Sequence, residues 1–441
     1  MLGLSSRPPL SVVDLFAGCG GLSLGLETAG FTPVMVNELS PDAMATYLDN
    51  RPELDALWKK YRIQDIKALV ANEEDLLEAF MKDMAIDYGI DPSQGDLDLV
   101  VGGPPCQGYS GIGHRRSYSV DRASLPSNHL YQDMARVIFR MRPKAFLFEN
   151  VRGLLSARWT SSGAKGEIWE DVLRTMTSIP GYRVVGHALV HASDFGVPQN
   201  RPRVIIVGIR DDIRAPDQRS SRGNGLIPDP TQRAPDLIDV LGDLVDLDYV
   251  PGSATARYPS EPLTVIQRRL RTDRAGDVVA PIGAVLSEQE YSDHTPAITR
   301  KFAYMLANDG RIPDDQVTKK FAQRVLPERW GPKGPSITVT SLPDDYVHFN
   351  QPRTVTVREW ARMQTFPDWY TFAGKRTTGG LRRAGNPQVG SFDRELPKYT
   401  QIGNAVPVWM ANALGRHIAA ILGVGAATNT AAESGQLVAA G

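Results

Sequence analysis

Cysteine is scarce in this chain, which has only two cysteines, Cys19 and Cys106, among 441 residues. Two cysteines cannot build a disulfide framework, and free thiols are typical of a reducing cytoplasm. The seven histidines show no paired spacing with one another or with the cysteines, which argues against a metal site. No apolar run is long enough to span a bilayer. A formal net charge of −1 excludes a generally basic nucleic-acid coat, but it leaves room for a local basic cleft.

A secretion signal is also lacking, because residues 1–8 contain no uninterrupted apolar core. We therefore expect a cytoplasmic protein. The chain is 42% hydrophobic and 22% charged, as soluble globular proteins are. Its length exceeds a single core of usual size, which predicts two domains.

Short apolar runs alternate with helical patterns through the first half of the chain. The expected strands are 12–16, 34–36, 97–101, 145–148, 184–190 and 204–209, with a further short strand ending before Asp65. The expected helices are 22–28, 42–48, 75–84, 130–141 and 169–178. This alternation predicts an α/β fold in which helices cover both faces of a mainly parallel sheet.

The pattern changes near residue 210. The polar run 217–225 indicates a boundary, and the sequence up to about Gln351 is irregular and rich in proline and arginine. Helical patterns return at 357–364 and 406–422, before an Ala/Thr/Ser/Gly-rich end. We predict a first domain over 10–210, a smaller second domain over 211–352, a return to the first domain over 353–422, and a disordered tail over 423–441.

The segment Asp14-Leu15-Phe16-Ala17-Gly18-Cys19-Gly20-Gly21 is a strand that enters a glycine turn before a helix. Such a turn lets a nucleotide-like ligand approach the backbone at a helix N-terminus. Its spacing departs from the dinucleotide pattern, which favours a smaller nucleoside. Glu38 ends the second strand at the interval where an acid binds ribose hydroxyls, and Asp65 ends the third. Each acid alone also fits an ordinary surface position.

The run Gly102-Gly103-Pro104-Pro105-Cys106-Gln107-Gly108 places a cysteine just past the carboxyl end of an apolar strand. Open α/β sheets bind their ligands at that edge. The glycines permit close approach and the prolines stiffen the chain before the sulfur. This arrangement favours a nucleophile, with a tight structural turn as the alternative.

Two further blocks carry charge near strand ends. Glu149 follows the strand 145–148, where it could donate a proton or hydrogen bond to a heterocycle nitrogen, or could serve as a capping or ion-paired acid. Arg201 and Arg203 stand two residues apart on an extended segment, so their guanidinium groups project to the same side. They could grip a phosphate or carboxylate, or line a solvated strand entrance.

Taken in order, six blocks resemble the DNA (cytosine-5) methyltransferase family. They are 16–21 (Phe-Ala-Gly-Cys-Gly-Gly), 103–108 (Gly-Pro-Pro-Cys-Gln-Gly), 149–151 (Glu-Asn-Val), 199–203 (Gln-Asn-Arg-Pro-Arg), 353–368 and 401–407 (Gln-Ile-Gly-Asn-Ala-Val-Pro). The unmatched stretch 209–351 falls where this family has its variable target recognition domain. The likeness is strongest to bacterial or phage modification enzymes, since no regulatory domain precedes Asp14.

The resemblance implies a Rossmann-like, S-adenosylmethionine-dependent methyltransferase sheet with a smaller, irregular target recognition domain. It implies methylation of cytosine C5 in a specific double-stranded DNA sequence, by base flipping and a covalent adduct between Cys106 and C6. Glu149 would act at N3, and Arg203, with Arg201 nearby, would hold the base. Cys19 would be a buried filler.

The resemblance also assigns a cofactor pocket for S-adenosyl-L-methionine, which leaves as S-adenosyl-L-homocysteine, and it implies no metal. Glu38 would bind the ribose, and Asp65 and Ile66 would lie near the adenine. Asn404 and Ala405 would close the site from the C-terminal helix. The remaining pocket residues would be Phe16, Ala17, Gly18, Gly20, Gly21, Pro104 and Leu130.

DNA contacts are expected from a loop over 108–119, which would close over the flipped base, and from basic clusters elsewhere. Thr338 would reach the backbone of the flipped nucleotide. The candidates are Gln107, Arg115, Arg116, Arg268, Arg269 and Arg271, together with the pairs Lys375-Arg376 and Arg382-Arg383.

The expected partner is double-stranded DNA. We expect the protein to act as a monomer and not to associate with a membrane. A cognate restriction endonuclease could act on the same site without a stable complex. RNA cytosine methylation by the same chemistry and a catalytically silent DNA-binding relative are the alternatives. The large unmatched region favours DNA, because it provides room for major-groove readout. A nicotinamide oxidoreductase fits poorly, since its glycine spacing differs.

Overall fold

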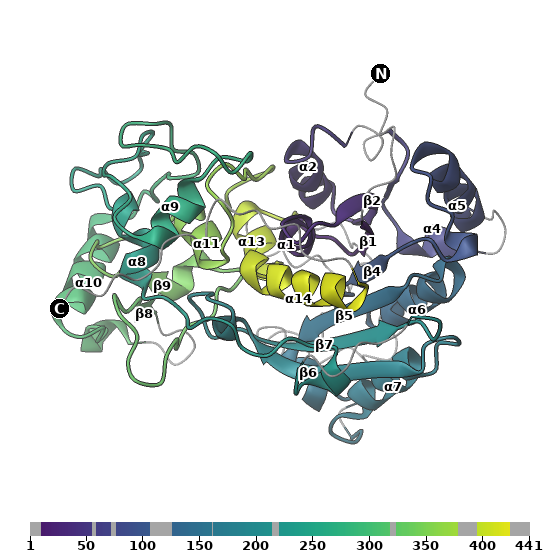
Figure 1. Cartoon of the computed structure of the whole chain (residues 1–441). Helices are drawn as coiled ribbons and strands as arrows, with labels where there is room; N and C mark the ends of the chain where they lie inside the picture. Colours follow the sequence, from purple (N-terminus) through teal and green to yellow (C-terminus); the bar gives the residue numbers. More distant parts are fainter. Residues whose placement is uncertain are drawn as a thin grey trace, which may run out of the picture.

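The computed structural model describes residues 10–54, 59–71, 76–105, 126–160, 162–213, 220–317, 323–377 and 395–423. In Figure 1 the large sheet and the helices around it occupy the right half of the molecule, and a smaller group of helices and short strands occupies the left half. Cys106, Gln107, Arg115 and Arg116 lie outside the described residues, as do Arg382, Arg383 and the tail beyond residue 423.

Seven strands form one sheet in the order β3-β2-β1-β4-β5-β7-β6. The first five in this order pair in parallel, and β7 runs antiparallel to both of its neighbours. The predicted α/β fold with a mainly parallel sheet is therefore confirmed. The strands are β1 (Ser11–Leu15), β2 (Thr32–Asn37), β3 (Arg62–Ile63), β4 (Leu99–Gly102), β5 (Ala145–Val151), β6 (Val184–His191) and β7 (Pro202–Ile209).

The central strands are apolar along their whole length because both faces of the sheet are covered. Alternate side chains point to opposite faces. Val12 and Leu147 belong to one hydrophobic core, whereas Val13 and Phe146 belong to another. Side chains of α1 (Gly21–Glu27) and α14 (Val408–Ile421) contribute to the first core. Side chains of α4 (Ile66–Val70), α5 (Leu76–Asp87), α6 (Leu130–Met141) and α7 (Glu167–Thr177) contribute to the second. Helices on both faces are thus confirmed.

The helices around the sheet are α1 (Gly21–Glu27), α2 (Pro41–Asp49), α4 (Ile66–Val70), α5 (Leu76–Asp87), α6 (Leu130–Met141), α7 (Glu167–Thr177) and α14 (Val408–Ile421). In the described parts of the chain, no helix is both long and apolar enough to cross a membrane.

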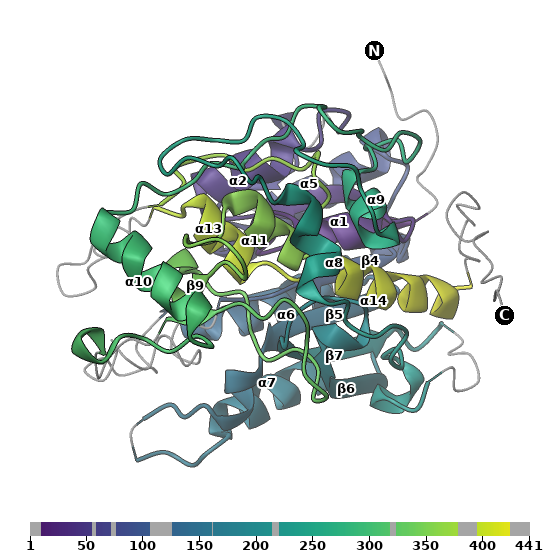
Figure 2. The ribbon, with the colours of Figure 1, turned by 90° about the vertical axis from the view of Figure 1, so that its left-hand side faces the viewer.

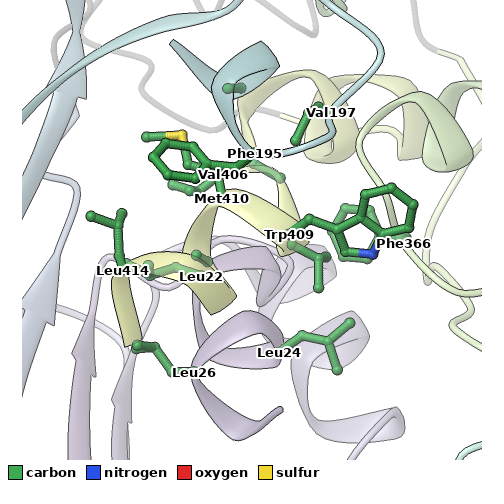
Figure 3. Close-up of a cluster of buried hydrophobic side chains, with 14 of the residues drawn as sticks. Leu22, Leu24, Leu26, Phe195, Val197, Phe366, Val406, Trp409, Met410 and Leu414 are labelled. Carbon is green, nitrogen blue, oxygen red and sulfur yellow. The ribbon is translucent and has the colours of Figure 1, made fainter. Parts of the chain in front are cut away.

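The C-terminal helix α14 lies against α1, although nearly 400 positions separate the two in sequence. Figure 3 shows Leu22 and Leu26 of α1 beside Met410 and Leu414 of α14. Gly25 makes this approach possible, because a Cβ there would overlap the Cβ of Ala411. The C-terminus thereby reaches the glycine turn at the start of α1.

The smaller lobe, which we define as residues 220–317 and 323–347, joins β7 to the returning chain. It holds α8 (Leu237–Leu241), α9 (Val265–Arg271) and α10 (Pro296–Ala307), with the short pair β8 (Arg324–Val325) and β9 (Tyr346–Val347). The region is irregular, as predicted, but the 12-residue α10 was not expected from the sequence. Helices α11 (Val357–Met363) and α13 (Lys398–Asn404) follow, between this lobe and the sheet (Figure 1).

Candidate active site

The glycine turn after β1 has a backbone suited to a ligand. Phe16, Gly18 and Gly20 have positive φ values of 58°, 57° and 84°. The amide of Ala17 donates to the carbonyl oxygen of Asn37 (2.9 Å). The Gly18 amide donates to Oε2 of Glu38 (2.9 Å). The turn is thus fastened to the end of β2, where parallel strands direct a ligand.

Glu38 is half-buried beside this turn, and its Oε1 accepts from the Ser40 amide (2.7 Å). Burial raises the pKa of its carboxyl, while the hydrogen bonds from Ser40 and Gly18 oppose that rise. Leu39, the next residue, is 65% exposed although it is a large hydrophobic side chain. Sequence reasoning missed Leu39, whose signal is an apolar residue directly after a strand-end acid.

The end of β3 lies next to Glu38. The side-chain amide of Asn37 donates to the carbonyl oxygens of Ile63 (2.9 Å) and Gln64 (3.0 Å). Asp65 is exposed and caps α4 by accepting from the Lys67 amide (3.0 Å). Ile66 is buried, 3% exposed, and its side chain belongs to the core. A ligand at this edge can therefore reach the Asp65 carboxylate.

Gly21 faces the segment that leads into α14, whereas Gly20 faces the side chains of Tyr370, Arg51 and Tyr47. A Cβ at Gly21 would overlap the Val406 carbonyl oxygen and stand 3.2 Å from the Cβ of Ala405. Ala405 is 9% exposed, and Asn404 before it is exposed. The structure therefore brings the predicted C-terminal residues to the glycine turn.

Pro104 and Leu130 lie at the end of β4. Pro104 is buried, and its carbonyl oxygen accepts from the Asn150 side chain (3.0 Å). Leu130 is half-buried at the first position of α6, one turn before Met134. The Met134 sulfur lies 3.0 Å from where a Cβ of Gly102 would stand. Both predicted residues thus border the strand that precedes Cys106.

Glu149 and Arg203 form a buried ion pair. Oε1 of Glu149 lies 2.6 Å from Nε of Arg203, and the residues are 8% and 6% exposed. They are diagonal neighbours on the antiparallel pair β5–β7, where Val151 stands opposite Arg203. A Cβ at Gly103 would stand 2.8 Å from Oε2 of Glu149. The chain entering Cys106 therefore passes directly against this carboxylate, and a side chain at position 103 would have to displace it.

Cys19, in contrast, has no nucleophilic character. It is 1% exposed, and burial raises the pKa of its thiol to about 12. Its Sγ donates to the Gln401 carbonyl oxygen (3.4 Å). The thiol acts as a buried filler between α1 and α13, as the sequence predicted.

Arg201 has different contacts from those predicted. Its guanidinium is 3% exposed and donates to three backbone carbonyl oxygens, those of Val339, Gly403 and Ala405. Both of its Nη atoms are thereby used. In this conformation Arg201 fastens the chain and does not share a base-binding fork with Arg203.

The predicted basic cluster on α9 needs correction. Arg271 is 2% exposed, because its Nε lies 2.7 Å from Oδ2 of Asp243 and its guanidinium covers the Tyr258 ring at 3.8 Å. It is a core ion pair and unavailable to DNA. Arg269 stacks on Trp409 (4.3 Å), which leaves Arg268 as the exposed member without such a contact.

The other described candidates for DNA contact are Thr338, Lys375 and Arg376. Thr338 is half-buried, and its hydroxyl donates to the Asn200 carbonyl oxygen, three residues before Arg203. Lys375 pairs with Glu395 (2.9 Å), and Arg376 donates to the Glu290 carbonyl oxygen (3.2 Å). Thr338 is thus the described candidate that contacts the segment leading into β7.

The site combines two functions at one edge of the sheet. The Phe16–Gly21 turn, Glu38 and Asp65 offer amides and carboxylates to a nucleoside with a polar tail. The Glu149–Arg203 pair offers carboxylate oxygens and a fixed cation, groups that can form hydrogen bonds with a heterocycle. Among the described residues, no group of three or more His, Cys, Asp or Glu side chains could hold a metal.

Comparison with known proteins identifies the family of this chain. The family model of C-5 cytosine-specific DNA methylases matches residues 10–420. The chain is 30% identical over 421 residues to the Type II methyltransferase M.DdeI of Desulfomicrobium norvegicum, covering 93% of this chain and 88% of the relative. It is also 30% identical over 422 residues to M.XorII of Xanthomonas oryzae pv. oryzae, covering 92% and 84% of the two chains.

A solved structure shares the fold. It is the crystal structure of a prophage-encoded E. coli protein assigned as a DNA modification methyltransferase, with a TM-score of 0.63 and 22% identity. The match covers 94% of this chain and 99% of that chain.

Proposed function

Because the chain belongs to the C-5 cytosine-specific DNA methylase family, we propose that it methylates cytosine within a specific sequence of duplex DNA, using S-adenosylmethionine. The chemistry is that of a DNA (cytosine-5) methyltransferase. The relatives M.DdeI and M.XorII carry Type II methyltransferase names, which supports a role in a restriction-modification system. A cognate endonuclease, action as a monomer and a bacterial cytoplasmic location are parts of the same proposal.

The cofactor site fits S-adenosylmethionine in three respects. Glu38 has carboxylate oxygens beside the glycine turn for the ribose hydroxyls, and exposed Leu39 offers an apolar surface to the adenine. The exposed Asp65 carboxylate can accept from the adenine amino group. Asn404 directly precedes Ala405, which lies against Gly21, and we assign the methionine end of the cofactor to Asn404. When bound, the sulfonium supplies a methyl group and becomes a neutral thioether.

Cys106 is the proposed nucleophile. Its thiolate adds to C6 of cytosine, so the C5–C6 π electrons move to C5, which then forms the new carbon–carbon bond. Glu149 holds a proton at N3, and Arg203 fixes that carboxyl while stabilising the charge that develops on the ring. Loss of the C5 proton to a base then expels the thiolate, which restores the aromatic ring and Cys106.

The target base must leave the duplex stack before Cys106 can reach it, at a cost of a few kcal/mol. We assign this step to the 108–119 loop, with Gln107, Arg115 and Arg116, although these residues lie outside the described part of the chain. Thr338 and Arg268 remain proposed backbone contacts. The smaller lobe, within the predicted 211–352 domain, is the proposed reader of the sequence.

One observation carries this proposal above the others. The chain that leads into Cys106 passes so close to Glu149 that a side chain at Gly103 would stand 2.8 Å from its carboxylate. A planar ring bound between residue 106 and Glu149 can therefore meet a nucleophile and an acid at once.

The test is a covalent trap. Purified protein is incubated with tritiated S-adenosylmethionine and duplex DNA containing 5-fluorocytosine. Fluorine at C5 blocks the final elimination, so we expect a labelled complex that survives denaturation. Sequencing the trapped DNA identifies the target site.

The controls separate the alternatives. Cys106→Ser should abolish the complex, whereas Cys19→Ser should retain it, because the Cys19 thiol is 1% exposed and lies against the Gln401 carbonyl oxygen. A complex formed on RNA and not on duplex DNA would favour the RNA alternative. Cofactor binding with no complex on either nucleic acid would contradict the catalytic proposal.

A further inference from the structure

Arg201 connects three distant segments of the chain. It stands just before β7, and its Nη1 donates to the carbonyl oxygen of Val339 (2.8 Å). Its Nη2 donates to the carbonyl oxygens of Gly403 (2.7 Å) and Ala405 (3.0 Å). These acceptors are 138, 202 and 204 positions away in sequence. A rigid guanidinium fork suits such a junction better than a lysine would.

The first of the joined segments is the cofactor-closing one, residues 403–405. Gln364 holds the same segment from another direction, since its side-chain amide donates to the carbonyl oxygens of Ile402 (2.7 Å) and Ala405 (3.2 Å). Ala405 in turn rests against Gly21 of the glycine turn. The position of Asn404 therefore depends on donors that lie outside its own helix.

The second joined segment, residues 337–339, lies on the DNA side. Asn200 donates its amide to the Ile337 carbonyl oxygen (2.7 Å), and the Val339 amide donates to Oε1 of Gln199 (3.0 Å). Thr338, the proposed backbone contact, stands between these two bonds. The third segment is β7 itself, where Arg203 pairs with Glu149 two residues after Arg201.

Arg201 is also an expensive residue to bury. In the described part of the chain no carboxylate forms an ion pair with it, and its Nε is buried without a hydrogen-bond partner. A buried cation satisfied mainly by carbonyl dipoles costs more free energy than an apolar side chain of similar volume. Simple packing therefore does not explain an arginine here.

We propose that Arg201 is a positioning residue that couples closure of the cofactor site to engagement of the target base. It does so by holding the Gly403–Ala405 segment, the Val339 segment and the Arg203 strand in one arrangement. This inference rests on the proposed function, whose cofactor and substrate define the two coupled sites. Coupling of this kind is reciprocal, so DNA and cofactor each strengthen the binding of the other.

The experiment measures S-adenosylhomocysteine binding by calorimetry, with and without a duplex that contains the target site. For Arg201→Met we expect the Kd of the DNA-free protein to rise about 10-fold, and the ratio of the Kd values without and with DNA to fall toward one. Arg201→Lys keeps the charge but loses the fork, so it should restore only part of the affinity.

Arg210 provides a matched control. It is a buried arginine at the opposite end of β7, and its Nη1 donates to the Gly95 carbonyl oxygen (2.9 Å). Arg210→Met should lower stability but leave both the Kd and the ratio unchanged. A general loss of packing would instead affect the two variants alike.

Two outcomes would overturn the assignment. One is an unchanged Kd and ratio in a folded Arg201→Met, and the other is a rise in Kd of equal size in Arg210→Met. If Arg201→Met does not fold, Gln364→Met removes the other side-chain donor to Ala405 and should weaken binding in the same way; unchanged binding there counts against the proposal. Absence of the fluorocytosine adduct in the wild type would instead refute the proposed function.

Discussion

The guanidinium of Arg362 donates two hydrogen bonds to the carboxylate of Asp243, which lies 119 positions away in sequence. Nη1 donates to Oδ1 (2.5 Å) and Nη2 donates to Oδ2 (3.1 Å). Both side chains are inaccessible to solvent. Arg362 also contacts Asp368 (2.6 Å), and Arg271 shares Asp243 from α9. This network joins the smaller lobe to α11, and through α11 to the residues that hold the cofactor-closing segment.

Breaking this network should be costly. Arg362→Met leaves the Asp243 and Asp368 carboxylates buried with fewer cations, so we expect the free energy of unfolding to fall by about 3–5 kcal/mol. Urea denaturation followed by circular dichroism measures the loss. Arg136→Met is the control, because the Arg136 side chain is 62% exposed beside Asp133; that loss should stay below about 1 kcal/mol. Equal losses in the two variants would contradict the structural role.

The buried arginines mark the limit of what the sequence predicts. The helix 130–141 was predicted with the bounds it has, because its apolar positions repeat at the helical period. Arg271 was expected on the surface, since nothing in its local sequence indicates a carboxylate 28 positions away. The misassignment of Arg201 has the same cause, because its acceptors are backbone atoms of distant segments. Local patterns specify elements, whereas partners of buried charges are set by the tertiary fold.

The site shows the same division. The mainly parallel sheet and the position of Glu38 directly after β2 follow from alternation and the α/β rule, whereas Glu149 lies inside β5, which extends three residues past the predicted end at 148. The contact between Gly103 and Glu149 does not follow from them, since it depends on the separation of β4 from β5 at one residue. Leu39 was missed because an exposed leucine is ordinary until the neighbouring turn gives it a ligand.

Phosphate contacts are expected near Thr338 more than on α9. Arg324 is exposed on β8, and its Nη2 donates to the Tyr346 hydroxyl (3.3 Å), which also accepts from the Thr338 amide (3.4 Å). Figure 2 shows β9 and α10 on the flank of the smaller lobe away from α9. Arg324→Gln should weaken DNA binding and reduce the slope of log K against log salt by about one phosphate contact, or ~0.9.

Filter binding at salt concentrations from about 50 to about 300 mM tests this expectation, because log K falls linearly with log salt over roughly this range. Arg183→Gln is the control, because the Arg183 side chain is 80% exposed at the opposite edge of the sheet, beside Asp211. A slope that changes equally in both variants, or in neither, would place the phosphate path elsewhere.

The contact between α1 and α14 should tolerate no added carbon. A Cβ at Gly25 would overlap both the Ala411 Cβ and the Val408 carbonyl oxygen, so Gly25→Ala must move the two helices apart. We expect a loss of about 1–3 kcal/mol in stability. Weaker S-adenosylhomocysteine binding should accompany it, because the chain before α14 forms one wall of the proposed cofactor site. Gly331→Ala, where nothing lies within 4 Å, should change neither property.

Asp14, directly before the glycine turn, should make stability depend on pH. It is 1% exposed, its Oδ2 accepts from the Ser23 hydroxyl (2.5 Å), and its Oδ1 has no hydrogen-bond partner. Burial raises the pKa of this carboxyl from 3.8 to about 7, with the Ser23 hydrogen bond opposing the rise. The native state therefore holds a proton between these two values that the unfolded chain has already lost.

The sign follows from this difference in bound protons. As pH rises from about 4 to about 7, the free energy of unfolding falls by up to ~1.4 kcal/mol per pH unit through this group, and above about pH 7 the loss is complete. The side chain in Asp14→Asn has no proton to lose in this range. The free energy of unfolding of the wild type should therefore fall relative to that of the variant as pH rises, until the difference becomes constant above about pH 7. Urea titrations of both proteins from about pH 5 to 8.5 give the difference directly. Parallel curves would show that Asp14 stays charged in the folded protein, and the attraction of the buried Arg51 cation would then outweigh the effect of burial.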